Sequence, residues 1–205
     1  MATAVANLTT TPTVVAVEVD RELSGAHWCA RFPGDNRLKA LDPTFKPSVD
    51  TFFSALDASG ARYIVSAVYR PKERAYLMHW SYKIAKGTIS PDKVPSHDGI
   101  LIEWVHPTAA ASIAAAKSMC DTYRTFHLGT EPALHSQHEV RLAVDVSISW
   151  VGTLAIQSKD GEEIKITSEP RTGMNRDLIV VGATYGVIKY NRTGTDKPHW
   201  SSTGA

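Results

Sequence analysis

The chain has 205 residues, 43% of them hydrophobic and 21% charged. This composition supports one folded domain, with or without an extension, and argues against global disorder. The 22 basic and 21 acidic residues leave a formal net charge of +1, which argues against a protein that holds nucleic acid mainly through its phosphates. No segment approaches the ~18 apolar residues of a membrane span, so membrane insertion is not expected.

The first 47 residues carry few regular signals. We expect residues 1–14, rich in Thr, Ala and Val, to form a flexible tail. Residues 20–47 contain recurrent Gly, Pro and Asp and predict an irregular lead-in. The N-terminus has neither the basic nor the apolar region of a signal peptide. We therefore expect synthesis in the cytoplasm without such a signal.

Helical patterns dominate the next part of the chain. Ser48, after Pro47, is the expected N-cap of the first helix, and Gly60 follows its end. Pro71 is expected in the first turn of the second helix, which Gly87 ends. The predicted elements are a helix at 48–58, a strand at 62–68, a helix from 71 to about 86, a loop at 88–106 with one strand in ILIEW, and a helix at 109–123.

Strand patterns dominate the second half. Apolar residues alternate with polar or small ones over 140–148, as in a half-buried strand. LAIQSK and EIKIT flank Asp160-Gly161, which predicts a hairpin. A helix at 175–185 and a strand at 186–190 follow. Helices first and strands later predict an α+β fold, with a small antiparallel sheet packed against N-terminal helices. The expected division is 1–47 as tail and lead-in and 48–205 as the domain.

Two segments carry residues suited to a metal. Residues 136–145 read Ser-Gln-His-Glu-Val-Arg-Leu-Ala-Val-Asp, and residues 196–200 read Asp-Lys-Pro-His-Trp. A catalytic zinc typically has three His, Asp or Glu ligands and an open fourth position. His138, Asp145 and His199 satisfy that count, although eight histidines make an isolated His and Asp pair weak evidence.

The first segment resembles the S-x-H-x-x-G-x-A-x-D signature of the D-Ala-D-Ala metallopeptidases. That family, with a Hedgehog-like zinc peptidase fold, includes zinc carboxypeptidases, dipeptidases and phage endolysins. The second segment resembles the family's acidic residue three places before a His. SAVYRP, residues 66–71, resembles its Tyr-Arg element. The three matches occur in the family's order over roughly residues 48–204.

The resemblance implies roles for individual residues. His138, Asp145 and His199 would bind Zn2+, Asp196 would be the general base, and Arg70 would contact a substrate carboxylate. Ser136 and Trp200 are further candidates for the substrate site, although Ser136 also fits a plain turn and Trp200 fits packing beneath the metal. Two positions depart from the family: Arg141 replaces its Gly, and Arg74 replaces a frequent Gln.

The spacing of the first motif requires a turn. In one straight strand His138 and Asp145 would lie ~23 Å apart on opposite faces. We therefore expect His138 in a bend and Asp145 in the following strand. A Gly would ease this bend, so Arg141 must adopt an ordinary backbone conformation or a costly one.

Several alternatives stay open. His135 or His79 could replace a ligand, Glu163 or Glu169 could act as the base, and Asp98 lies in a loop of the kind that binds ligands. Arg70 could instead pair with Glu73 or Asp98. Cys29 and Cys120 could be free thiols or a bridge, because their spacing does not decide between these states.

The expected function is zinc-dependent hydrolysis of peptidoglycan stem peptides, with an endopeptidase favoured over a D,D-carboxypeptidase. The expected setting is the periplasm or cell wall, reached by holin-dependent release as a lysin or by injection through a secretion machine as an antibacterial effector. The alternatives are a non-catalytic zinc module that binds peptidoglycan or a protein partner, and a structural spike protein that needs no zinc.

Overall fold

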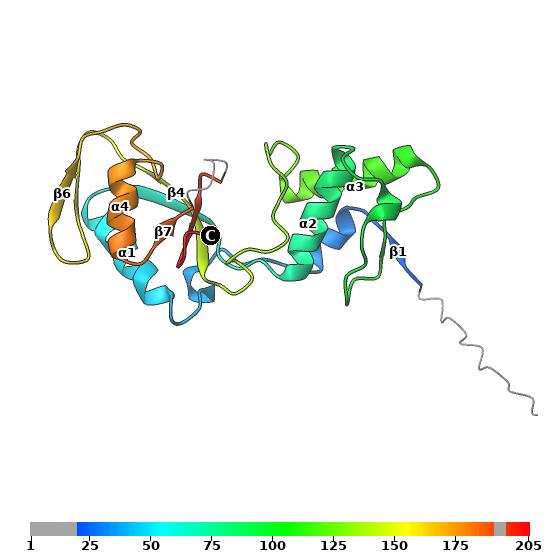
Figure 1. The fold of residues 1–205 in the computed structure, drawn as a ribbon, viewed down its shortest axis with the longest axis horizontal. Coiled ribbons are helices and arrows are strands. Elements are labelled where there is room, and N and C mark those ends of the chain that lie inside the picture. The colour runs from blue at the N-terminus through cyan, green and yellow to red at the C-terminus, as the bar shows by residue number, and fades with distance from the viewer. Residues whose placement is uncertain (1–19, 191–195) are drawn as a thin grey trace, which may run out of the picture.

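A computed structural model describes residues 20–190 and 196–205, so the expected tail at 1–14 lies outside the described residues. The chain forms two lobes joined side by side (Figure 1). Each lobe has its own cluster of buried apolar side chains. We call them the helical lobe and the strand lobe.

The helical lobe is built around two helices that pack on each other. These are α2 (Lys72–Ala85) and α3 (Ala109–Tyr123). A 3-10 helix at Ala26–Ala30 packs against them and buries Trp28 and Cys29. Two short parallel strands, β1 (Glu22–Leu23) and β3 (Ile102–Glu103), and a 3-10 helix at Pro91–Lys93 complete the lobe.

The strand lobe holds a four-stranded antiparallel sheet in the order β2-β4-β8-β7. Its strands are β2 (Arg62–Ala67), β4 (Ala143–Ser149), β8 (His199–Ser201) and β7 (Ile188–Lys189). The remaining elements are α1 (Lys46–Ala58), α4 (Arg176–Thr184), the 3-10 helix Leu38–Ala40, and the hairpin β5 (Leu154–Gln157) and β6 (Glu163–Ile166). The fold is therefore mixed, with small antiparallel sheets.

Most predicted elements are present, with shifted ends. The helix at 109–123 has the predicted bounds, and Thr108 caps it by accepting a hydrogen bond from the Ala111 amide. The first helix begins at Lys46 rather than 48, and Ser48 is not its cap. The Lys46 amide instead donates a hydrogen bond to the Asp42 carbonyl at 2.9 Å, and this bond closes the first turn. β1 and β8, of two and three residues, were not predicted.

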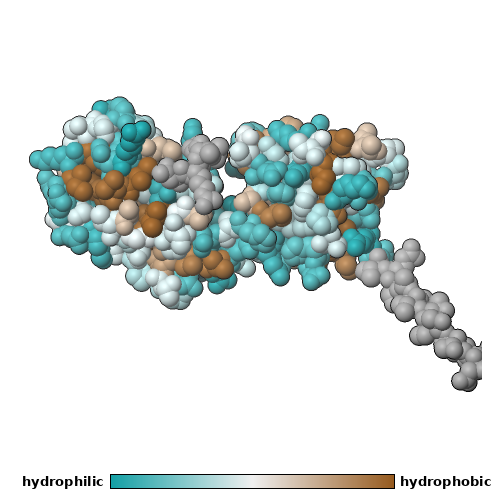
Figure 2. Space-filling model, in the orientation of Figure 1, coloured by the Kyte–Doolittle hydropathy of each residue, from teal (hydrophilic) through white to brown (hydrophobic). Residues whose placement is uncertain are grey.

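Of the three predicted N-terminal helices, only the first packs against the large sheet. α1 contributes Val49, Phe52, Phe53 and Leu56 to the core of the strand lobe, whereas α2 and α3 belong to the other lobe. The lead-in contributes to both cores, through Trp28 in the helical lobe and Phe45 in the strand lobe. Figure 2 shows apolar residues gathered over α4, and a hollow between the lobes.

Two further features concern the chain as a whole. Cys29 and Cys120 are buried free thiols, which settles the alternative that the spacing left open. In the part of the chain that the structure describes, none of the helices has the length and apolarity needed to cross a bilayer.

Gly182 allows α4 to approach the sheet closely. A Cβ atom at this position would lie 2.7 Å from the Trp200 ring and 3.0 Å from the Val187 carbonyl oxygen. We expect Gly182→Ala to lower the free energy of unfolding by about 1–3 kcal/mol, because overpacking forces the neighbours to shift. Urea unfolding measures this. Gly129→Ala is the control, because nothing lies within 4 Å of its Cβ position, and equal losses in the two variants would contradict the prediction.

Candidate metal centre

Three buried side chains from different parts of the strand lobe meet at one point. His138, Asp145 and His199 each offer a ligand atom, and these atoms all lie within 4.8 Å of one another. Asp145 and His199 are direct partners in the antiparallel pairing of β4 with β8. His138 reaches them from the turn before β4. The structure thus brings together the three predicted ligands.

The turn before β4 reverses the chain as the spacing required. The Leu142 amide donates to the Gln137 carbonyl at 2.9 Å, and the Arg141 amide donates to the His138 carbonyl at 3.3 Å. Arg141 adopts a left-handed conformation with φ 63°, which is unfavourable for a residue other than glycine. Its guanidinium lies 4.4 Å from the centroid of the Tyr69 ring, a cation–π contact that offsets part of this strain.

The distances within the group match the size of a zinc site. His138 Nε2 lies 3.0 Å from Asp145 Oδ1, and His199 Nδ1 lies 3.2 Å from each of these atoms. Ligand atoms at ~2.0–2.2 Å from a tetrahedral ion are themselves about 3.3–3.5 Å apart. The triangle is slightly smaller than that, so a small expansion would accommodate the ion.

The outward nitrogens fix where the histidine protons lie. His138 Nδ1 contacts the Val68 carbonyl oxygen at 2.9 Å, and His199 Nε2 contacts the Ala205 main-chain oxygen at 3.2 Å. A carbonyl oxygen only accepts, so each outward nitrogen must donate. In neutral rings the inward nitrogens then carry lone pairs, and three acceptor atoms converge without a proton. A cation at this point resolves the conflict, as at metal-binding histidines whose other nitrogen is hydrogen-bonded.

Asp145 stays ionised in this setting. Burial raises the pKa of its carboxyl group, but the two neighbouring imidazole rings and the charge of Arg70 outweigh burial and hold the pKa below its usual value. An ionised carboxylate is the form that binds a metal.

Arg70 lies at the edge of this group. Its amide donates to the His138 carbonyl at 3.2 Å, and its Nη2 lies 3.8 Å from Asp145 Oδ2. Neither Glu73 nor Asp98 forms an ion pair with it in the described residues. The guanidinium lines a pocket of about 610 Å3 between the two lobes, which Asp145 also lines.

Asp196 lies next to the metal group on the chain segment that leads into β8. Its carbonyl accepts the buried Lys189 ammonium at 3.0 Å, and the same ammonium donates to the His199 carbonyl at 2.8 Å. Neighbouring protein atoms displace water from the Asp196 carboxylate, and this loss of hydration raises its pKa. The negative charge of Asp145 raises it further. Burial lowers the pKa of Lys189 to about 8. The sequence analysis did not identify Lys189, although the alternation of side chains along a strand places it on the same side as the buried Val187.

Ser136 and Trp200 occupy different places. The Ser136 hydroxyl is buried and has no hydrogen-bond partner among the described residues, so it is available to a group not present there. Trp200 has no exposed surface, and its ring packs 5.7 Å from that of Phe52. Because contact with a substrate would need β8 to move, we leave Trp200 out of the proposed substrate contacts.

The alternative residues lie elsewhere. His135 is exposed and pairs with Glu139, and the buried His79 of α2 contacts the Pro132 carbonyl oxygen. Glu163 pairs with Lys165 and Glu169 with Arg171. Asp98 lies in an exposed turn of the helical lobe. None of these belongs to the three-residue group.

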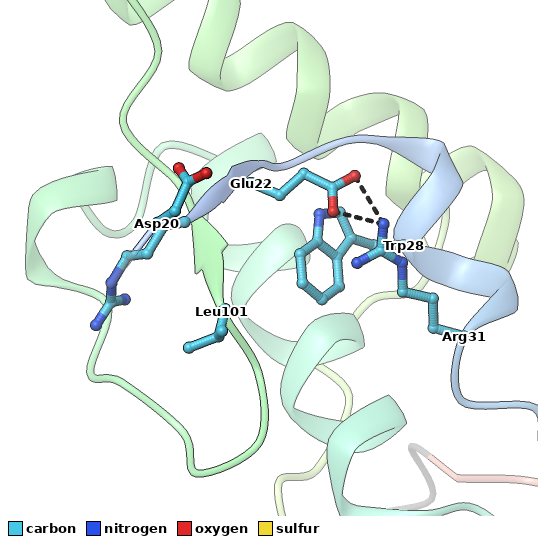
Figure 3. A pocket seen from close by; sticks show the side chains of 6 residues that line it. Asp20, Glu22, Trp28, Arg31 and Leu101 are labelled. Atoms are coloured by element: carbon cyan, nitrogen blue, oxygen red, sulfur yellow. Dashed lines mark hydrogen bonds and ion pairs between the residues drawn. The ribbon is translucent and has the colours of Figure 1, made fainter. Parts of the chain in front are cut away.

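A second pocket, of about 420 Å3, lies on the helical lobe. Figure 3 shows the side chains that line it, among them Glu22, Trp28 and Arg31. The Arg31 guanidinium lies 4.0 Å from the Trp28 ring centroid and binds both oxygens of Glu22 at 2.6 and 2.7 Å. Its charge is thus satisfied within the protein, and we assign this pocket no role.

Comparison with known proteins gives a distant similarity. No family model matches the chain, and no curated protein does either. One similar solved structure is a VanY vancomycin-resistance D,D-pentapeptidase mutant from a VanB-type cassette in complex with Zn(II), 21% identical over 78% of this chain and 71% of that chain, with a TM-score of 0.39. Another is VanYB in complex with D-alanine-D-alanine, 18% identical over 92% and 80%, with a TM-score of 0.40. Similarity at this level does not establish a shared fold or activity.

The left-handed conformation of Arg141 can be tested by substitution. We expect Arg141→Gly to keep the parent's free energy of unfolding within about 1 kcal/mol, because relief of the strained backbone offsets the lost cation–π contact. Arg141→Val loses the contact and keeps the strain, so we expect a loss of about 2 kcal/mol. Urea unfolding of both variants measures the difference, and equal stabilities would contradict the left-handed turn.

Proposed function

We propose that this chain is a zinc-dependent peptidase that hydrolyses peptide stems of peptidoglycan. The observation that carries the proposal is the convergence of three buried acceptor atoms, from His138, Asp145 and His199, beside a pocket that contains an arginine. The resemblance of residues 136–145 and 196–200 to the D-Ala-D-Ala metallopeptidase motifs supports the choice of substrate.

Zinc is the metal that this set of donors fits best. Two imidazole nitrogens and one carboxylate oxygen are a common ligand set of catalytic zinc, with the fourth position left to water. A zinc ion held there supplies a Lewis acid and lowers the pKa of water toward ~7.

The remaining roles belong to side chains around the metal group. Asp196 accepts the proton of the attacking water at its carboxylate and later donates it to the leaving amine. Arg70 orients a substrate carboxylate through its planar guanidinium. The free Ser136 hydroxyl donates a hydrogen bond to the substrate or to a group that supports it. Lys189 holds the Asp196–His199 segment in place through two carbonyl groups.

Endopeptidase activity and delivery as a lysin or effector remain predictions of the sequence. The products distinguish the activities, because a carboxypeptidase releases free D-Ala from a pentapeptide stem, whereas an endopeptidase shortens cross-linked or mid-stem peptides.

The first experiment combines metal content with product analysis. We expect about one zinc ion per purified chain, and hydrolysis of purified muropeptides, followed by mass spectrometry, that stops after chelation and returns with added zinc. His199→Ala should lose zinc and activity together, because it removes one of three protein ligands. His135→Ala is the matched control, since that histidine is exposed and outside the group. Full activity without metal would overturn the proposal.

A second experiment tests Asp196 separately from the metal. Asp196→Asn keeps the shape of the side chain and removes its basicity, so we expect bound zinc to remain while kcat falls about 10²–10⁴-fold. Zinc content by atomic emission and the initial rate on the same peptide measure both. An unchanged rate would exclude Asp196 as the base.

A further inference from the structure

The pocket between the lobes has a cationic wall opposite the metal group. On the strand-lobe side it is lined by Arg70 and Asp145, and on the helical-lobe side by Arg74, Arg124 and His127. Arg124 and His127 are exposed. A ligand in this pocket would therefore lie between Arg70 on one side and two further arginines on the other.

The carboxylates of the pocket do not neutralise this wall. Asp35 is held by Arg37, which contacts its two oxygens at 2.9 and 2.6 Å. Asp145 belongs to the metal group. Within residues 20–190 and 196–205, neither Arg74 nor Arg124 forms an ion pair with a carboxylate. The positive charge of the wall is therefore available to a ligand.

Arg74 is anchored and has a defined position. Its Nη1 lies 3.4 Å from the carbonyl oxygens of Cys29 and Phe32, and its guanidinium lies 4.7 Å from the centroid of the Tyr123 ring. These partners orient the guanidinium without cancelling its charge. The residue that departs from the frequent Gln of the resembled family thus adds a fixed cation to the pocket.

Arg124 occupies a position that normally favours glycine. It follows the last residue of α3 with φ 57° and ψ 37°. Its amide donates to the Asp121 carbonyl, and the Thr125 amide donates to that of Cys120, which is the Schellman pattern of helix ends. The other three α-helices of the described chain end in the same two-bond pattern, and they place glycine there: Gly60, Gly87 and Gly186.

The end of a helix does not by itself explain why arginine, rather than glycine, occupies position 124. Glycine adopts the left-handed conformation without steric strain, whereas arginine does so at a cost. Strained residues of this kind cluster at ligand sites, where the side chain has a task. Arg124 lines the pocket, and its cationic side chain offers a ligand there a partner that glycine could not provide.

We propose that Arg124, with Arg74 beside it, forms a second anion subsite for a carboxylate of the peptide that is separate from the one held by Arg70. The inference rests on the proposed function, because it takes Arg70 to hold the first carboxylate. The preferred substrate is then a peptide with two acidic groups, one on each side of the pocket. An arginine pairs with a carboxylate through two parallel hydrogen bonds, which gives both affinity and orientation.

The test uses pairs of fluorescein-labelled peptides that end in D-Ala-D-Ala and differ only by Glu or Gln, at one of three positions upstream. Fluorescence anisotropy with the zinc-loaded protein gives Kd, and mass spectrometry follows cleavage of the same peptides. We expect the parent to bind the Glu peptide of at least one pair roughly tenfold more tightly than its Gln partner.

The variants separate ligand binding from a structural role. In Arg124→Gln and Arg124→Gly the preference should fall to less than about threefold. Arg124→Gly should also have a Tm at or above that of the parent, because it relieves the backbone. Arg176→Gln, an exposed arginine of the strand lobe, is the matched control and should keep the full preference.

The outcomes distinguish the two proposals. A preference that depends on Arg124 while no peptide is cleaved supports the subsite and counts against the proposed peptidase. Cleavage without any preference, or a preference that survives in Arg124→Gly, overturns the subsite and leaves the peptidase standing. Absence of both cleavage and preference overturns both.

Discussion

Two imidazole nitrogens and one carboxylate oxygen meet in the strand lobe, and much of the surrounding structure holds them there. The Val68 and Ala205 oxygens turn the two imidazole rings so that their lone pairs face Asp145 Oδ1. Pairing of β4 with β8 places Asp145 beside His199, and a tight turn delivers His138. With both rings neutral and no cation present this arrangement is repulsive, so the protein scaffold holds a geometry that a bound metal would stabilise.

Two arginines in left-handed conformations mark the surroundings of this centre. Arg141 closes the turn that carries His138, and its guanidinium lies on Tyr69, next to Arg70 in the chain. Arg124 ends α3 at the pocket between the lobes. Each stands where glycine would be less strained. The sequence thus accepts local strain in the turn before β4 and at the end of α3 and gains a cationic side chain at each site, a balance typical of functional regions.

The local elements and the three residues of the metal group could be predicted from the sequence, whereas the arrangement of the lobes could not. Alternation predicted β4, and Asp160-Gly161 predicted the β5–β6 hairpin, because these signals are short-range. The motif spacing correctly required a bend at His138. β1 and β8 are too short for any periodicity, and their pairing with strands distant in the chain cannot be predicted from local sequence. The start of α1 moved because the Asp42 carbonyl, rather than Ser48, completes the first turn. The pocket could not be predicted from the sequence, because its lining residues come from two lobes that meet only in the folded protein.

The most direct test of the metal centre observes the histidine nitrogens. Long-range ¹H–¹⁵N spectra of the imidazole rings, assigned with His138→Gln and His199→Gln, should show a proton on Nδ1 of His138 and on Nε2 of His199 in the zinc-loaded protein. Added zinc should shift only the inward nitrogens, His138 Nε2 and His199 Nδ1, to values typical of metal ligands, with saturation at one ion per chain. Inward nitrogens that keep their signals when zinc is added in excess would contradict a metal site at this position.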